Sequence, residues 1–315
     1  MDWMRETNEM RLAYSDALIE RGRVDERICV VEADLMGSSS TGRFQKLFPE
    51  RTIDVGVAEA NMIGVAAGLA AMGKIPFTHT FTPFATRRCC DQVTLSVAYA
   101  RMNVKMVGSD PGVCAELNGG THMSFEDMAI MRNIPGMVVC EPVDSVQLRK
   151  LFGQIVDHEG PVYMRLFRKA PWKVFDESAE FTLGKACTLK KGRDATVFAT
   201  GIMVKEALDA AETLAGEGVD VEVVNIHTLK PLDTQAVLES VARTGCCVTA
   251  ENAFAINGLG SAVADCVCAA RPCPVLRVGV DDRFGEVGKL DYLQSALRLT
   301  AADIVEKVRA AIAMK

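Results

Sequence analysis

Several features that would assign this sequence to a special class are missing from it. No apolar run approaches the roughly 20 residues that a membrane-spanning helix needs. The net charge is −6, so there is no excess of basic side chains for nucleic acid or acidic membrane surfaces. The opening residues, MDWMRETNEMR, lack the apolar core of a secretory signal. We therefore expect a cytoplasmic protein that binds neither nucleic acid nor membranes.

Metal-binding and disulfide patterns are missing too. The 11 cysteines are odd in number and include no CxxC pair. None of the 4 histidines lies at ligand spacing from a cysteine, so a zinc site is not expected. We expect buried, reduced thiols and no metal held by this chain.

Apolar runs of two lengths alternate along the first half of the chain. Short runs rich in β-branched residues predict strands, and longer amphipathic runs predict helices. The predicted strands are 28–33, 74–81, 104–109, 136–141 and 161–167. The predicted helices are 57–72, 84–101, 124–132 and 143–158. This alternation is typical of a parallel sheet covered by helices on both faces.

The pattern lapses over 171–192, which we interpret as a linker, and then resumes. The later strands are predicted at 194–200, 219–225, 246–251 and 274–280, and the helices at 203–216, 234–243 and 260–270. With 315 residues, the chain is long enough for two domains. The expected fold class is α/β, with consecutive domains at 1–170 and 193–315, each a mainly parallel sheet flanked by helices.

One stretch combines a single acid with a long apolar helix. In DVGVAEANMIGVAAGLAAMG, Glu59 is the one charged side chain after Asp54. A first-turn carboxylate can simply satisfy the helix dipole. Held among apolar groups, however, a carboxyl has its pKa raised and can share a proton with a heterocyclic nitrogen. Phe81 and Phe84, in THTFTPF, suit either a core or stacking against such a flat ring.

The same helix carries a stripe of small residues. Ala60, Gly64 and Gly68 recur every four residues, on one helical face. Each internal glycine costs about 1 kcal/mol relative to alanine, so close packing against another backbone is expected to offset that cost. The stripe indicates a crowded interface, with contact between subunits as one option.

The run GVAEANMIGVAAGLAAMGKIPFTHTFTPF resembles the pyrimidine-binding domain of transketolases and 1-deoxyxylulose-5-phosphate synthases. Three later stretches extend the resemblance: GSDPGVCAELNGGTHMSFEDMAIMRNIPGMVVCEPVD, YMRLFRK and DDRFGEVGKLDYL. Several spaced motifs in one order, over nearly the whole chain, make it specific. It implies a thiamine-diphosphate-binding pyrimidine-type domain followed by a transketolase C-terminal-type domain.

The resemblance also implies roles in cofactor binding. Glu59 matches the glutamate that contacts N1′ of the cofactor pyrimidine, and Phe84 the phenylalanine that stacks on it, with Phe81 beside it. Asp34, in EADLMGS, matches the family's cofactor-side aspartate, although a loop aspartate is commonly a cap. The bound cofactor would serve as the electron sink when a two-carbon ketol unit passes from a ketose phosphate to an aldose acceptor.

Half of the cofactor site is missing from the sequence. Thiamine enzymes of this family hold the diphosphate and its Mg²⁺ or Ca²⁺ through a GDG…N segment, and no GDG occurs here. The glycine-rich GLGSA at Gly258 lacks the Walker lysine and the GxGxxG spacing. The length and start fit the C-terminal half of a transketolase encoded as two polypeptides. The resemblance therefore implies an N-terminal partner subunit carrying GDG…N, in an α₂β₂ assembly.

Further matches concern the sugar phosphate. His122, in NGGTH, matches the histidine that hydrogen-bonds the sugar near the reacting carbons, and it could shuttle protons. Arg11, Ser38 and Arg168 match residues that meet the phosphate, for which arginine is well suited. Arg165 is a near alternative to Arg168, and we interpret it as a solvated surface charge.

Two substrate-side positions depart from the family pattern. Ser109 stands where transketolases carry a phosphate-contacting histidine, and Asn118 stands where they carry an aspartate that contacts a sugar hydroxyl. These changes indicate that the natural sugar differs from xylulose 5-phosphate, with a branched or otherwise modified phosphoketose as one option. His79 either compensates for them or packs in the core.

Other functions remain open at this stage. A 1-deoxyxylulose-5-phosphate synthase fragment or a 2-oxo-acid dehydrogenase β-type subunit would keep the thiamine chemistry. The synthases usually read EQH where this chain has Glu59-Ala60-Asn61, and the dehydrogenase subunits lack the GGTH-type histidine. A non-catalytic scaffold paralogue is the third option, although Glu59, Phe84 and His122 are all retained.

Overall fold

The computed structural model describes residues 2–315, which form two compact units. The N-terminal unit consists of Met4–Pro111 and Ile130–Leu183. The C-terminal unit consists of Gly112–Ala129 and Gly184–Lys315, together with the start of the chain. Each unit is an α/β layer structure with a mostly parallel sheet, so the predicted fold class is confirmed.

The N-terminal unit is built on parallel strands in the order β5-β6-β4-β3-β1-β2. These strands are β1 (Ile28–Glu32), β2 (Thr52–Asp54), β3 (Ile75–Phe81), β4 (Lys105–Ser109), β5 (Val138–Cys140) and β6 (Val162–Leu166). Every residue of β1, β4 and β6 is buried, as expected for a sheet covered on both faces. The structure adds the short strand β2 to those predicted.

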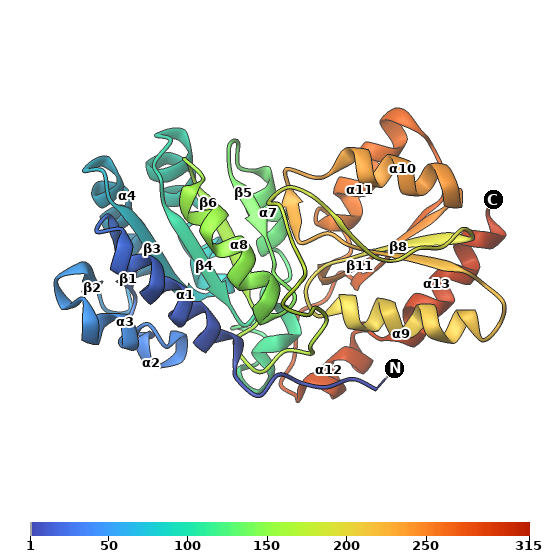
Figure 1. The fold of residues 1–315 in the computed structure, drawn as a ribbon, viewed down its shortest axis with the longest axis horizontal. Coiled ribbons are helices and arrows are strands. Elements are labelled where there is room, and N and C mark those ends of the chain that lie inside the picture. The colour runs from blue at the N-terminus through green and yellow to red at the C-terminus, as the bar shows by residue number, and fades with distance from the viewer. Residues whose placement is uncertain (1) are drawn as a thin grey trace. The chain divides into compact units, whose positions relative to one another are not determined.

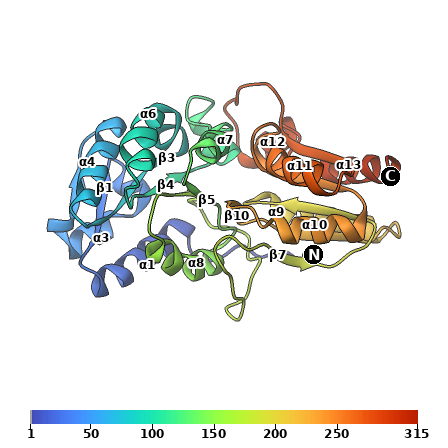
Figure 2. The same cartoon turned by 90° about the horizontal axis from the view of Figure 1, so that it is seen from above.

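Helices cover both faces of this sheet. Seen from above in Figure 2, α1 and α8 lie on one side of β1, β3 and β4, and α4 and α6 lie on the other. The longer helices and the elements after β1 are α1 (Met10–Val24), α2 (Met36–Ser39), α3 (Gly42–Leu47), η1 (Pro49–Arg51), α4 (Glu59–Ala71) and α8 (Ser145–Asp157). The segments between β4 and β5 are η4 (Gly112–Asn118) and α7 (Asp127–Asn133).

The local sequence explains why α8 forms and how it is oriented. The Asp144 side chain accepts a hydrogen bond from Gln147 N at 2.9 Å and caps the helix. Leu148, Leu151 and Phe152 follow at helical spacing and are all buried. The helix therefore lies with its apolar face on the sheet.

The helix predicted at 84–101 is wrong as a single element. It is divided into α5 (Thr82–Ala85), η2 (Arg87–Cys89), α6 (Cys90–Gln92) and a π-helical segment, η3 (Val93–Tyr99). The break lies at Thr86, whose backbone is non-helical and whose hydroxyl donates to the carbonyl of Thr82 at 2.7 Å. Short π segments often accompany functional sites, and this one follows the predicted cofactor phenylalanines.

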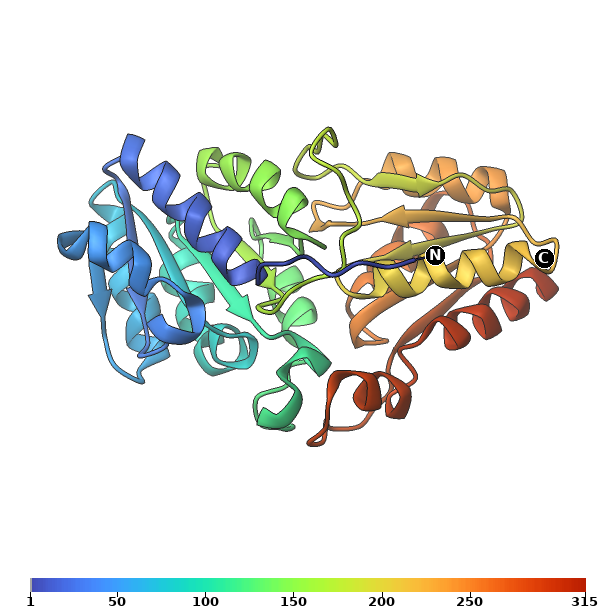
Figure 3. The same ribbon diagram turned by 60° about the horizontal axis from the view of Figure 1, so that its bottom comes forward.

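The C-terminal unit has a five-stranded sheet in the order β12-β11-β8-β9-β7, with β7 antiparallel. Figure 1 shows α10 and α11 on one side of β8 and β11, and α9 and α13 on the other. In Figure 3 the yellow helix α9 and the red helix α13 lie side by side. The strands of this sheet are β7 (Cys187–Lys190), β8 (Ala195–Ala199), β9 (Val221–Asn225), β11 (Cys247–Phe254) and β12 (Val275–Val280). The short strand β10 (Thr228–Lys230) lies outside it. The helices are α9 (Met203–Ala215), α10 (Thr234–Thr244), α11 (Leu259–Ala270), α12 (Leu290–Ala296) and α13 (Ala301–Ala313).

The predicted elements of this second sheet are present, and the structure adds several more. Strand β7 falls inside 171–192, where a linker was expected, and pairs with β9. Among residues 2–315, none of the helices is long and apolar enough to cross a membrane.

Candidate functional site

The predicted site residues of the N-terminal unit gather where its parallel strands end. Strand register places Phe81 opposite Ser109 on β3 and β4, and Glu32 opposite His79 on β1 and β3. Loops after the carboxyl ends of neighbouring parallel strands share one edge of the sheet, which is the usual ligand-binding edge of such folds. Asp34 follows β1 at this same edge.

The Asp54 carboxylate binds the backbone just before α4, the helix that begins with Glu59. Asp54, the last residue of β2, accepts hydrogen bonds from Gly56 N at 2.9 Å and from Asp34 N at 3.0 Å. Gly56 has φ +70°, which favours glycine. Asp34 is itself exposed, with φ +60°. Asp54 thus joins the loop of Asp34 to the entry of α4.

Glu59 is buried, with 4% of its surface exposed, and its partner is an arginine. Arg88 Nη1 lies 2.9 Å from Oε1 and 3.0 Å from Oε2 of Glu59. The Arg88 guanidinium also lies over the Phe84 ring, 3.8 Å from its centroid. Arg88 was not predicted as a site residue. The sequence gives no signal for it, because Arg87 stands beside it in the same motif.

The neighbouring thiol of Cys89 is affected by the Glu59 carboxylate. Its thiol contacts the carbonyls of Phe84 and Ala85 at 3.2 Å each. Burial, and then the negative charge of Glu59, raise the pKa of the Cys89 thiol to about 12. The Glu59 carboxylate is therefore close enough to the buried Cys89 thiol to oppose its ionisation.

Aromatic and charged groups continue from Phe84 to Arg168. The Phe81 and Phe84 rings are 6.2 Å apart with an edge-on arrangement. The Arg168 guanidinium lies 5.6 Å from the Phe81 centroid and forms an ion pair with the buried Asp110 at 2.8 Å. Asp110, adjacent to Ser109, is a second residue that sequence reasoning missed.

Arg11 lies next to this group through the backbone. Its amide donates to the carbonyl of Arg168 at 3.2 Å. Its guanidinium donates to the carbonyl of Ser38 at 3.1 Å and forms an ion pair with Glu9 at 2.5 Å. The predicted phosphate-side residues Arg11, Ser38 and Arg168 therefore lie together.

Several buried polar side chains lie at the same edge of the sheet. The Ser109 hydroxyl, the Tyr14 hydroxyl and both ring nitrogens of His79 are buried without a hydrogen-bond partner. Burial, and then Arg168, lower the pKa of His79 to about 3. Of the two interpretations of His79, its 1% exposure agrees with packing in the core.

Glu32 belongs to the same buried group. It accepts hydrogen bonds from the hydroxyls of Ser39 at 2.8 Å and Thr41 at 2.5 Å. Burial raises the pKa of the Glu32 carboxyl to about 7, against these hydrogen bonds. A protonatable carboxyl therefore supports the loop between Asp34 and Ser38.

The interpretation of Arg165 as a solvated charge is wrong. Its side chain is fully buried and pairs with Glu141, itself 4% exposed, at 3.1 Å. The residue lies on β6, an interior strand whose residues are all buried. Its charge therefore needs a buried counter-ion.

His122 and Asn118 belong to the C-terminal unit. The His122 ring bonds the Thr121 hydroxyl at 2.9 Å through Nδ1, and Asn118 is exposed. A Cβ at Gly120 would approach the carbonyl oxygen of Gly285 to 2.3 Å, so the NGGTH loop lies against the DDRFGEVG segment. Two of the motifs that carry the family resemblance are thus in contact within one unit.

The other end of that loop is also fixed. Gly112 has φ +50°, and a Cβ there would lie 2.2 Å from Asn252 Oδ1. The same Asn252 oxygen accepts a hydrogen bond from Val113 N at 3.0 Å. Both ends of the segment that carries Asn118 and His122 are therefore held by the body of the C-terminal unit.

Two other features do not form a phosphate site. At GLGSA, the Glu251 carboxylate accepts hydrogen bonds from Leu259 N at 2.7 Å and Gly260 N at 2.8 Å, so an internal anion already fills this helix N-terminus.

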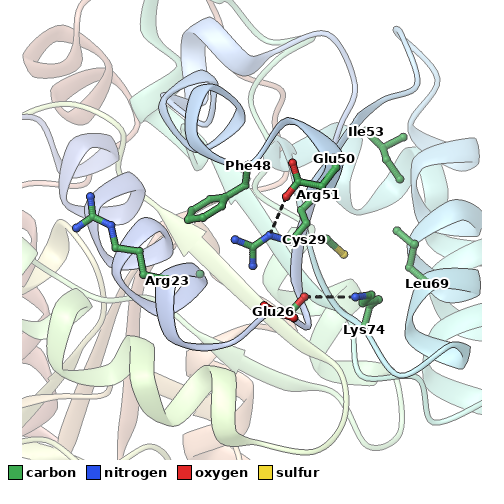
Figure 4. A pocket seen from close by; sticks show the side chains of 10 residues that line it. Arg23, Glu26, Cys29, Phe48, Glu50, Arg51, Ile53, Leu69 and Lys74 are labelled. Atoms are coloured by element: carbon green, nitrogen blue, oxygen red, sulfur yellow. Dashed lines mark hydrogen bonds and ion pairs between the residues drawn. The ribbon is translucent and has the colours of Figure 1, made fainter.

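The 560 Å³ pocket of Figure 4, lined by residues that include Cys29, Arg51 and Lys74, lies at the opposite, amino-terminal end of β1 and β3. Across residues 2–315 there is no cluster of three or more His, Cys, Asp or Glu side chains suited to a metal ion.

The small-residue stripe of α4 faces outward. Ala60, Gly64 and Gly68 are exposed, and a Cβ at either glycine would meet nothing within 4 Å. Leu95 and Tyr99, on the adjacent η3, are 55% and 85% exposed. Exposed apolar surface of this kind marks contact sites between proteins.

Comparison with known proteins places this geometry in a family. The transketolase pyrimidine-binding domain matches residues 6–171, and the transketolase C-terminal domain matches 184–304. The 6-deoxy-6-sulfo-D-fructose transketolase subunit SqwH of Clostridium sp. (strain MSTE9) is 63% identical over 96% of this chain and 92% of that protein. The putative transketolase C-terminal section of Methanocaldococcus jannaschii is 40% identical over 95% of each chain.

A solved structure agrees with these relatives. The structure described as "Split gene transketolase, inactive beta4 tetramer" has a TM-score of 0.90 and 41% identity, and the match covers 98% of this chain and 100% of that one. The chain therefore belongs to the transketolase family, among the C-terminal subunits of split transketolases.

Proposed function

We propose that the chain acts with an N-terminal subunit as a thiamine-diphosphate-dependent transketolase, transferring a two-carbon ketol unit from a ketose to an aldose phosphate. The observation that supports this most is the buried Glu59 carboxylate, joined to the Phe84 ring through one planar, hydrogen-bonding cation. An acid and a ring face arranged around a flat group fit the aminopyrimidine of thiamine diphosphate.

In this proposal the chain holds the pyrimidine half of the cofactor. Glu59 would hold N1′ of the pyrimidine by sharing a proton with it, as a positioned carboxyl group can. Phe84 stacks on the ring, with Phe81 beside it, and Asp34 contacts the cofactor from the loop after β1. When bound, thiamine diphosphate supplies the electron sink for cleavage next to a carbonyl.

The residues that match the family's sugar-phosphate contacts hold the substrate. Arg11, Ser38, Ser109 and Arg168 surround the terminal anion of the sugar, because three of them already lie together and Ser109 lies at the same sheet edge. His122 hydrogen-bonds the sugar near the reacting carbons and acts as a proton carrier. Asn118 contacts a sugar hydroxyl.

We further propose that the donor is 6-deoxy-6-sulfo-D-fructose. Support comes from the name of the 63% identical relative and from Ser109, which replaces a phosphate-contacting histidine. A sulfonate is a monoanion, whereas a phosphate monoester carries nearly two charges at pH 7. An uncharged hydroxyl in place of an imidazole suits the smaller charge.

The partner subunit holds the diphosphate and its Mg²⁺ or Ca²⁺ through GDG…N, in an α₂β₂ assembly. The exposed stripe of Ala60, Gly64 and Gly68, with Tyr99 beside it, supports a subunit contact next to Glu59. The proposal also includes family domains at 1–170 and 193–315, joined by a linker at 171–192 that contains strand β7. A cytoplasmic location is a further part of it.

Donor profiling of the two subunits mixed together tests the function. We expect turnover of 6-deoxy-6-sulfo-D-fructose in the presence of an aldose phosphate, and slower turnover of xylulose 5-phosphate. A preference for xylulose 5-phosphate would contradict the sulfonated donor while leaving the transketolase activity in place. Pyruvate as the preferred donor would instead indicate a synthase or a 2-oxo-acid dehydrogenase.

A further inference from the structure

We propose that Arg88 is a placeholder for the cofactor pyrimidine, which has to leave Glu59 and Phe84 before the pyrimidine can bind. The inference rests on the proposed function, because it takes Glu59 and Phe84 as the pyrimidine contacts. It adds a residue to which neither the family resemblance nor the relatives assign a role.

The contacts of Arg88 coincide with those expected of the pyrimidine. Its Nη1 donates to both carboxylate oxygens of Glu59, at 2.9 and 3.0 Å. Its guanidinium covers the Phe84 ring at 3.8 Å from the centroid, a cation–π contact. Because one guanidinium makes both contacts, it covers the face of Phe84 that is turned toward Glu59. A second planar group cannot occupy that space at the same time.

Burial shows which partner is free to move. The Glu59 side chain is 4% exposed and fixed at the start of α4, whereas the Arg88 side chain is 46% exposed. Arg88 therefore reaches the carboxylate from the solvent side, and it can return to water by rotating its own side chain. Glu59, in contrast, is enclosed by the protein.

The ion pair between Arg88 and Glu59 stabilises the chain before the cofactor binds. A buried carboxylate without a counter-ion is strongly destabilising. Arg88 removes that cost, and the pyrimidine takes over the carboxylate when it arrives. If Arg88 covers the site in about nine molecules of ten, the apparent affinity for the cofactor is about tenfold weaker than the intrinsic affinity.

The test compares Arg88→Met with Arg87→Met in the assembled two-subunit enzyme. Methionine keeps the volume of the arginine stem and removes its charge, and Arg87 is the neighbouring exposed arginine. The measurement is the dissociation constant of thiamine diphosphate, with Mg²⁺, by fluorescence titration. We expect binding about tenfold tighter in R88M and little change in R87M.

Weaker or unchanged binding in R88M would overturn the placeholder role. Failure of the wild-type complex to bind thiamine diphosphate at all would instead contradict the proposed function, so the two failures are distinguishable.

A second measurement uses the chain alone and needs no cofactor. We expect R88M to lower the melting temperature, because it leaves Glu59 without a counter-ion, and E59Q/R88M to recover most of the loss. If R88M does not fold, folding of E59Q/R88M still supports the pairing. A double variant no more stable than R88M would contradict it.

Discussion

Two buried glutamates, one in each unit, are satisfied in different ways. In the C-terminal unit, the Glu251 carboxylate accepts hydrogen bonds from the backbone amides of Leu259 and Gly260 at the start of α11. In the N-terminal unit, Glu59 is reached by an arginine that is 46% exposed, and Glu32 keeps one oxygen without a partner.

This difference distinguishes carboxylates that stabilise the fold from carboxylates that can bind a ligand. Groups satisfied by the backbone stabilise one arrangement, since removing either partner is costly. A carboxylate with an unpartnered oxygen, or with a half-exposed counter-ion, remains available to a ligand. Such groups are common at functional sites. The unpartnered atoms of Tyr14, His79 and Ser109 lie at the same end of the N-terminal sheet as Glu59.

The largest expected effect is on turnover, from Glu59→Gln in the assembled enzyme. Loss of a positioned acid–base group lowers rates by about 10²–10⁴-fold, so kcat falls by that factor while the subunits still assemble. Steady-state kinetics and size-exclusion chromatography measure the two. Glu251→Gln is the matched control in the other unit, with kcat near wild type. Full activity in E59Q would remove the mechanism.

A stability effect comes next, from the buried pair in β6. Arg165→Met leaves Glu141 buried without its partner, and we expect the free energy of unfolding to fall by about 3–5 kcal/mol in urea. Arg149→Met is the control, because its ion pair with Glu177 is exposed and contributes about 0–1 kcal/mol. Equal losses in both variants would show that burial does not govern these pairs.

The smallest expected effect is a pH dependence set by Glu32. Its pKa is raised from 4.5 to about 7 by burial, so the folded state favours the protonated acid. Its contribution to stability is fully present below about pH 4.5 and is lost as the pH rises through about 7. Glu32→Gln should therefore raise the free energy of unfolding above pH 7, by about 1–3 kcal/mol. An unchanged pH profile between 5 and 8 would contradict this assignment.

Much of the fold could be predicted from residue patterns, because strands such as β1 and helices such as α8 carry their burial in their own sequence. The break in the helix predicted at 84–101 could not, because the apolar pattern continues past Thr86, where the backbone leaves the helical conformation. Arg165 was misplaced for a related reason: the sequence around a charged residue gives no sign of a buried partner elsewhere in the fold, here Glu141.

The candidate site also contains residues that the sequence could predict and residues that it could not. Glu59, Phe84 and Arg168 stand in motifs that identify them, and the structure places them in one group. Arg88 and Asp110 are counter-ions, and a counter-ion is defined by distance in space rather than by a motif. No pattern in TRRCCDQV distinguishes Arg88 from Arg87.

Calorimetric titration of thiamine diphosphate and Mg²⁺ decides whether this chain supplies only the pyrimidine side of the cofactor site. Titrated into the purified chain alone, the cofactor should give no measurable tight binding. Titrated into an equimolar mixture with the N-terminal subunit, it should bind tightly, with one cofactor for each pair of subunits. Tight, metal-dependent binding to the chain alone would contradict the division of the site between two polypeptides.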